Sequence, residues 1–275
     1  MVKKILAKSY IWLMLLLMYA PIILLCVFSF TDSKVLGIWE GFSFDLYKEL
    51  FNNNEIMVAL FNTLTVAFTA SICATILGTL GAIGIYYSKK KMKKVMEIGN
   101  QIPVMNAEII MAVSLAILFT LVFGFFSKIS GKEIGFNFIT LVIGHMVITT
   151  PFVVLSVMPK LKQMDSNIYE AALDLGATPT YALYKVVLPE IMPGILSGFL
   201  LSVTLSLDDY IITVFTKADT YSTLSTLVYE KTKKVVPPAM RALTTIIFFV
   251  MLLVVLLINL NNANKKVKAK RRYGR

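Results

Sequence analysis

The chain has 275 residues, of which 57% are hydrophobic and 16% are charged. Soluble domains carry about 45–50% apolar and about 25% charged residues, and disordered chains are poorer still in apolar residues. The composition therefore argues against both classes. Lys and Arg number 27 against 16 Asp and Glu, and the formal net charge of +11 would by itself suit a nucleic-acid partner. The distribution of the charge along the chain argues against that partner.

Six segments are long and apolar enough, or nearly so, to cross a bilayer as helices, since about 20 apolar residues span its core. Their apolar runs are continuous and do not alternate, which favours helices over barrel strands. The first run is too long for a signal peptide and is interpreted as a retained span. We predict an all-α polytopic membrane protein. Its spans are expected at about 10–30, 58–87, 96–126, 134–158, 191–216 and 242–260.

The basic residues predict the orientation, because cytoplasmic flanks of spans are rich in Lys and Arg. With the N-terminus inside, the inner segments hold 18 of the 27 basic residues, including Lys89–Lys94 and the tail 261–275. Both termini are therefore expected to be cytoplasmic. The basic runs are interpreted as flanks that face the lipid bilayer, and no nucleic-acid partner is expected. The exception is the last outer loop, which carries Lys231, Lys233, Lys234 and Arg241.

The longest inner connection, 159–190, has the pattern of two short helices. The run Asp165–Asn167 can cap the first helix, with Glu170 as the capping-box partner of Asn167. Gly176 fits the position just after a helix end, and Thr178-Pro179 fits the start of a second helix. The pattern therefore predicts a helix, a tight turn and another helix at the membrane face.

Ala172 and Gly176 lie four positions apart, so they share a face with almost no side chain that another protein could approach closely. The alternative is a hairpin that only joins two spans. The segment resembles the EAA loop of ABC-importer permeases, whose pattern is E-A-A-x3-G-x9-I-x-L-P, with Val186 here in place of Ile. The residues that match this pattern are Glu170, Ala171, Ala172, Gly176, Leu188 and Pro189.

This resemblance implies the six-helix MetI-like fold of type I ABC importers, with 159–190 as the cytoplasmic loop that docks on an ATPase subunit. The stretches 107–119, 145–154 and 205–215 further resemble PotC-type permeases of spermidine/putrescine importers, and the likeness runs over nearly the whole chain. It implies a bacterial cytoplasmic-membrane protein that forms half of a polyamine pathway. The implied partners are a PotB-like permease in a heterodimer, a PotA-like ATPase dimer and a PotD-like extracytoplasmic binding protein.

The chain lacks the G-x-x-x-x-G-K-[ST] motif that holds nucleotide phosphates, and no catalytic or metal-binding motif is visible. We therefore expect no enzyme activity and no cofactor on this chain, with ATP and Mg²⁺ in the partner ATPase. One alternative is a permease for another small cation or solute. A secondary transporter, driven by an ion gradient, would be expected to show inverted repeats, and none is convincing here. An intramembrane enzyme would need a catalytic set that the sequence does not show.

Acidic residues occur inside the predicted spans, where each ionised carboxylate costs roughly 2.5–3.5 kcal/mol on insertion scales. Counting about 1.5 Å of helix rise per residue, Glu108, Asp208 and Asp209 fall in one slab with His145, past the midplane toward the outside. We expect the three acids to line a path that attracts a polycation. Tyr210 could add a cation–π face to this path.

Each of these residues also has a simpler interpretation. Asp208 and Asp209 could be solvated carboxylates at an ordinary outer helix end. Glu108 could be a cap or an ion-pair partner at a helix break after Pro103. For His145 we favour the simpler interpretation, which is a buried packing histidine with its hydrogen bonds satisfied.

Overall fold

The computed structural model describes residues 2–33, 35, 37–232, 237–250, 252 and 253. These residues form helices, turns and loops, together with one isolated antiparallel bridge between Thr31 and Phe42. The chain divides into two compact units. One is Val58–Tyr229, and the other combines Met1–Met57 with Glu230–Arg275.

Five helical stretches among the described residues are long and apolar enough to cross a membrane. The sixth predicted span, 242–260, falls only partly within the described residues, where a shorter apolar helix covers Ala239–Val250. The count of six spans and the cytoplasmic termini therefore remain predictions. The five stretches are α1 (Val2–Phe28), α3 (Asn54–Tyr87), α5 (Glu108–Ser130), α6 (Phe138–Gln163) and the run Pro179–Asp208.

Two predicted spans are broken rather than continuous. The segment 96–126 contains most of α4 (Lys90–Met105) and then α5, because Asn106 and Ala107 adopt extended backbone angles. The segment 191–216 contains most of α9 (Leu188–Asp208) and then α10 (Ile211–Thr216), because Asp209 is extended. Hydropathy could not show either break, since apolar residues resume directly after each of them.

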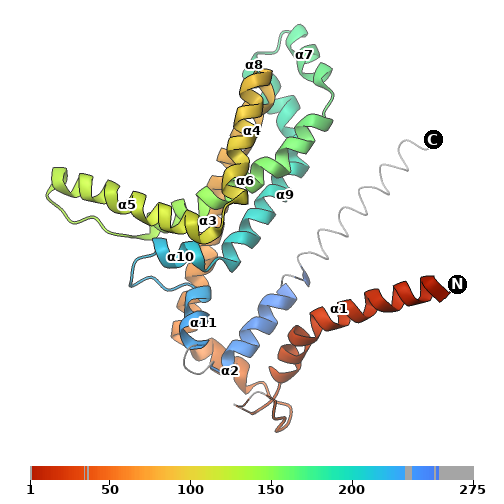
Figure 1. The fold of residues 1–275 in the computed structure, drawn as a ribbon, viewed down its shortest axis with the longest axis vertical. Helices are drawn as coiled ribbons and strands as arrows, with labels where there is room; N and C mark the ends of the chain where they lie inside the picture. The colour runs from red at the N-terminus through yellow and green to blue at the C-terminus, as the bar shows by residue number, and fades with distance from the viewer. Residues whose placement is uncertain (1, 34, 36, 233–236, 251, 254–275) are drawn as a thin grey trace. The chain divides into compact units, whose positions relative to one another are not determined.

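The helix α6 is the centre of unit Val58–Tyr229. It packs along α9 and also contacts α4, α5 and α10, and Figure 1 shows α6 and α9 side by side. Its start is fixed by Asn137, whose side chain accepts hydrogen bonds from the backbone N–H groups of Ile139 and Thr140. Its buried face then joins residues of α3 and α9 in one apolar core, which includes Ala74, Val153, Val157, Leu161 and Ile191.

Glycines bring two neighbouring helices close to α6. A Cβ atom at Gly78 of α3 would lie 2.7 Å from the Val153 Cβ, and one at Gly198 of α9 would lie 3.1 Å from the Val153 Cγ1. Val153 is therefore held between two glycine positions on different helices. By contrast, a Cβ atom at Gly84, farther along α3, would meet nothing within 4 Å.

The unit formed by the two ends of the chain has its own small aromatic cluster. After α1 ends, the ring of Phe30 stacks on that of Phe42 with a centroid distance of 5.6 Å and lies 5.2 Å from that of Tyr47. The short amphipathic helix α2 (Asp45–Asn52) buries Leu46 and Leu50. The helix α1 itself is largely exposed, as expected for a span that faces lipid or another subunit.

We expect Gly78→Ala to destabilise the protein by about 1–3 kcal/mol, because the added methyl group overpacks the α3–α6 contact at Val153. Gly84→Ala is the matched control on the same helix and should be neutral or stabilising by about 0.5–1 kcal/mol through helix propensity. Thermal unfolding of the purified chain in detergent measures both. Equal melting temperatures for the two variants would contradict the close approach of α3 and α6.

Candidate functional site

The helix α7 (Ser166–Asp174) begins with a side-chain cap. Asp165 provides it, because its carboxylate accepts a hydrogen bond from the Asn167 backbone N–H at 3.0 Å. The capping box expected between Asn167 and Glu170 is absent, because the helix starts two residues earlier than that pairing requires. Glu170 instead lies exposed within the helix.

The end of α7 confirms the turn predicted at Gly176. Its φ angle is +88°, a left-handed conformation that glycine adopts without a steric penalty. The Gly176 N–H donates to the Leu173 carbonyl at 2.9 Å, and the Ala177 N–H donates to the Ala172 carbonyl at 3.0 Å. These two bonds form a Schellman motif, which satisfies the carbonyls that the helix end leaves free.

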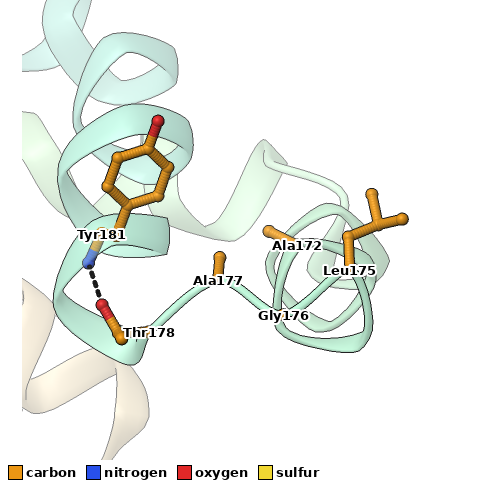
Figure 2. Close-up of a pocket in the computed structure, with 6 residues that line it drawn as sticks. All are labelled: Ala172, Leu175, Gly176, Ala177, Thr178 and Tyr181. Atoms are coloured by element: carbon orange, nitrogen blue, oxygen red, sulfur yellow. Dashed lines mark hydrogen bonds between the residues drawn. The ribbon is translucent and has the colours of Figure 1, made fainter.

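The predicted start of the next helix is also confirmed. Thr178 accepts a hydrogen bond from the Tyr181 backbone N–H through its hydroxyl, and Pro179 is the first residue of α8 (Pro179–Ala182). Figure 2 shows Thr178 and Tyr181 beside the turn, with the Leu175 side chain directed away from α8. Leu175 is 89% exposed, which is unusual for so large an apolar side chain.

A hollow of about 540 Å³ opens at this turn. Ala172 and Gly176, which the sequence placed on one face, both line it. The sequence reasoning missed its other lining residues, although an apolar residue directly before the turn glycine was a usable signal. These other residues are Leu175, Ala177, Thr178 and Tyr181.

The remaining matched residues connect the turn to the core. A π-helical turn, η1 (Leu183–Val187), lies between α8 and α9, and the Leu188 N–H donates to the Leu183 carbonyl five residues back. Pro189 explains this wider turn, because its ring lacks an N–H and clashes with the carbonyl four residues before it. Leu188 packs against the core, so it does not line the hollow.

The acids were predicted to share one region, and the structure brings them together at the break between α9 and α10. Asp209 is 6% exposed. Its carboxylate accepts hydrogen bonds from the backbone N–H groups of Ile212 and Thr213, at 3.2 and 2.8 Å, and from the Thr213 hydroxyl at 2.8 Å. Asp209 is therefore not a solvated carboxylate at a helix end, and it caps the start of α10.

Glu108 and Asp208 differ from Asp209 because both are exposed. Glu108 is the first residue of α5 and Asp208 is the last residue of α9. Because α10 packs against α5, the Glu108 carboxyl lies within reach of the Asp209 carboxyl and near that of Asp208. Tyr210 is half-buried, and its ring centroid lies 4.4 Å from that of Tyr229.

His145 is a buried histidine with its hydrogen bonds satisfied, as we expected. Its Nδ1 lies 2.7 Å from the Ser206 hydroxyl, and its Nε2 lies 3.0 Å from the Thr213 hydroxyl. Sequence reasoning did not identify these two partners, since they lie more than 60 positions away along the chain. The acids and His145 thus form one polar region in the otherwise apolar packing of α5, α6, α9 and α10.

A family model described as "binding-protein-dependent transport system inner membrane component" matches residues 74–265. The chain belongs to this family. It is also 34% identical to the spermidine/putrescine transport system permease protein PotC of Haemophilus influenzae, over 86% of this chain and 89% of that one. It is 33% identical to the putrescine transport system permease protein PotI of Escherichia coli K12, over 82% of this chain and 79% of that one.

The fold agrees with membership in this permease family. A bacterial ABC transporter involved in the import of the acidic polysaccharide alginate contains a chain that superposes with a TM-score of 0.75. The two chains are 19% identical, and the alignment covers 96% of this chain and 95% of the other. The protein therefore has the all-α, multi-pass fold of ABC-importer permeases, and the turn around Gly176 lies in the region that resembles their EAA loop.

Proposed function

We propose that this chain is a permease subunit of an ABC importer for polyamines, such as spermidine and putrescine, in the cytoplasmic membrane of a bacterium. The observation that carries the proposal is the identity of 33–34% to PotC and PotI over more than four-fifths of the chain. The exposed carboxylates of Glu108 and Asp208 support a cationic cargo, because negative charge stabilises a polyamine along its path.

The proposed assembly pairs this chain with a PotB-like permease, so that each contributes half of the pathway. A dimer of PotA-like ATPases binds ATP and Mg²⁺ on the cytoplasmic side, since this chain lacks a phosphate-binding loop. A PotD-like binding protein delivers the polyamine to the outer mouth. A related arrangement is known for the alginate importer, which was solved with its ligand-bound periplasmic protein.

The α7–α8 turn is proposed as the surface that docks on the ATPase. Its hollow is lined largely by small residues, which lets another backbone approach, and the exposed Leu175, which also lines it, offers an apolar anchor. Tyr169 fixes α7 to the membrane-spanning core, with its ring 5.3 Å from that of Tyr87. A movement of the ATPase is therefore passed to the core rather than lost in a loose loop.

One continuous helical run connects the turn to the acids. The run Pro179–Asp208 is helical throughout, passing from α8 through η1 into α9. One end borders the docking turn and the other end is Asp208. Closure of the ATPase dimer would therefore tilt this helical run, which we call the rod. The tilt would move Asp208 at the outer end of the cation path, in line with alternating access.

The exposed acids are assigned different roles from Asp209. Glu108 and Asp208 have carboxylates that a cation can reach, and Tyr210, two positions after Asp208, adds a partly exposed ring. The Asp209 carboxylate is enclosed by its own hydrogen bonds and adds negative potential without direct contact. Of the three acids predicted to line the path, two are thus assigned to direct contact with the cation, and the buried Asp209 is not.

We expect Leu175→Asp to prevent stable docking of the ATPase, because it places a charge in the apolar centre of the interface. Thr180→Asp is the matched control, since this exposed residue carries the same new charge just outside the hollow. The amount of ATPase that co-purifies with the permease pair measures the effect. Normal co-purification with Leu175→Asp would contradict the docking surface.

We expect Asp208→Asn and Glu108→Gln each to lower spermidine uptake roughly tenfold, which corresponds to about 1.4 kcal/mol of lost cation stabilisation. Glu133→Gln, a neutralised exposed acid in the loop after α5, should leave uptake unchanged. Uptake is measured in cells that express the whole transporter, with the amount of each variant checked in the membrane. Unchanged uptake in both path variants would exclude these acids from the pathway.

A further inference from the structure

His145 is the single histidine of the chain, and the transport mechanism above does not use it. It is 2% exposed and lies on α6, inside a span. Its two ring nitrogens contact different helices, with Nδ1 on Ser206 of α9 and Nε2 on Thr213 of α10. Nε2 also lies 3.4 Å from the Asp209 Oδ2. The ring therefore links both sides of the α9–α10 break.

One arrangement of protons satisfies every member of this network. The Thr213 hydroxyl donates to the Asp209 Oδ2 at 2.8 Å, so its oxygen is free to accept from the Nε2–H of His145. The Nδ1 of a neutral ring then accepts the hydroxyl proton of Ser206. The chain of bonds runs in one direction from α9 through the ring to Asp209, and it needs no charged imidazole.

A fourth segment is tied to the same point. The Ser225 hydroxyl donates to the Asp209 backbone carbonyl at 2.7 Å from the first turn of α11 (Leu224–Thr232). The backbone and the side chain of Asp209 are thus both held. The neighbouring Asp208 has no such constraint, and its exposure follows from the way in which Asp209 is turned inward.

We propose that His145 is a positioning residue for the cation path, which it serves by holding the α9–α10 break so that Asp208 stays exposed. The proposal rests on the proposed function in one respect, the assignment of Asp208 to the path. Without the ring, the Ser206 and Thr213 hydroxyls lose a buried partner, and the end of α9 is free to turn Asp208 away from the path.

The test measures the accessibility of position 208 directly. In the assembled transporter, Cys26→Ser and Cys73→Ala first remove the native thiols, and Asp208→Cys introduces a reporter. A membrane-impermeant trimethylammonium methanethiosulfonate then labels the reporter, and mass spectrometry of this chain gives the rate. We expect His145→Leu to slow the labelling about fivefold, the factor that follows from loss of one buried hydrogen bond.

Matched variants separate positioning from a general loss of packing. His145→Gln should keep the labelling rate near that of the parent, because its amide offers one acceptor and one donor at a similar reach. Thr149→Val, one turn farther along α6 and also buried, should have no effect, since its hydroxyl donates to the backbone carbonyl of His145 and the imidazole keeps both of its partners. A reporter from Thr204→Cys, one turn before Asp208 on α9, should be labelled at the same rate in every background.

The labelling rate at position 208 decides whether His145 is a positioning residue. If position 208 is labelled equally fast, or faster, with His145→Leu, the proposal is wrong. If His145→Leu does not accumulate, Ser206→Ala removes one of the two ring partners and must slow the labelling in its place; an unchanged rate overturns the proposal. Slowed labelling, together with a parent transporter that keeps Asp208 and His145 and still takes up no spermidine, would leave the role of His145 standing and refute the polyamine function instead.

Discussion

A helix that breaks inside an apolar span leaves backbone N–H groups without partners, and lipid offers no water to replace them. The carboxylate of Asp209 meets this need, because it accepts hydrogen bonds from the N–H groups of Ile212 and Thr213. The arrangement of the site depends on this interaction. It lets the chain turn after α9, so that α10 packs on α5 and α6 and the exposed acids come close to one another.

The break also ends the helical rod Pro179–Asp208, and the two ends of this rod have different proposed roles. At its start, the turn at Gly176 and the exposed Leu175 form a surface suited to an ATPase. At its end, Asp208 is exposed beside the capped start of α10. The π-helical turn before Pro189 keeps the rod continuous where proline would otherwise interrupt it. In the proposed mechanism, ATPase coupling and cargo contact therefore lie at the two ends of one helical run, so that ATP hydrolysis on the partner subunit would act on the cation path through this run.

Local signals in the sequence were enough for the docking turn. Gly176 and Thr178-Pro179 act on their own helix ends, so their positions were readable from spacing alone. A helix break after Pro103 was one interpretation left open for Glu108, but hydropathy continues across Ala107 and Asp209 and did not locate either break. The buried state of Asp209 was missed for a different reason. Its hydrogen-bond donors, Ile212 and Thr213, lie only three and four positions later, but the prediction of one continuous span hid this local capping pattern. Its contact with His145, 64 positions earlier, is not visible in one sequence.

The insertion cost of a carboxylate drew attention to three acids that the structure brings together, and their role in the pathway stays a prediction. It favoured a role for Glu108, Asp208 and Asp209 in a cation path, while simpler interpretations as helix-end or capping residues stayed open. For Asp209 the structure gives an offset within the fold, since both carboxylate oxygens accept hydrogen bonds. Of the three acids, Glu108 and Asp208 are the two that are exposed.

The most direct test of this account is the melting temperature of the purified chain in detergent with Asp209→Asn, compared with Asp208→Asn. Both oxygens of Asp209 face donors, so the amide N–H₂ group of Asn must point at one of them. We expect Asp209→Asn to cost about 2 kcal/mol and to lower the melting temperature by roughly 4–8 °C, while Asp208→Asn leaves it unchanged. A melting temperature for Asp209→Asn equal to that of the parent would contradict the account.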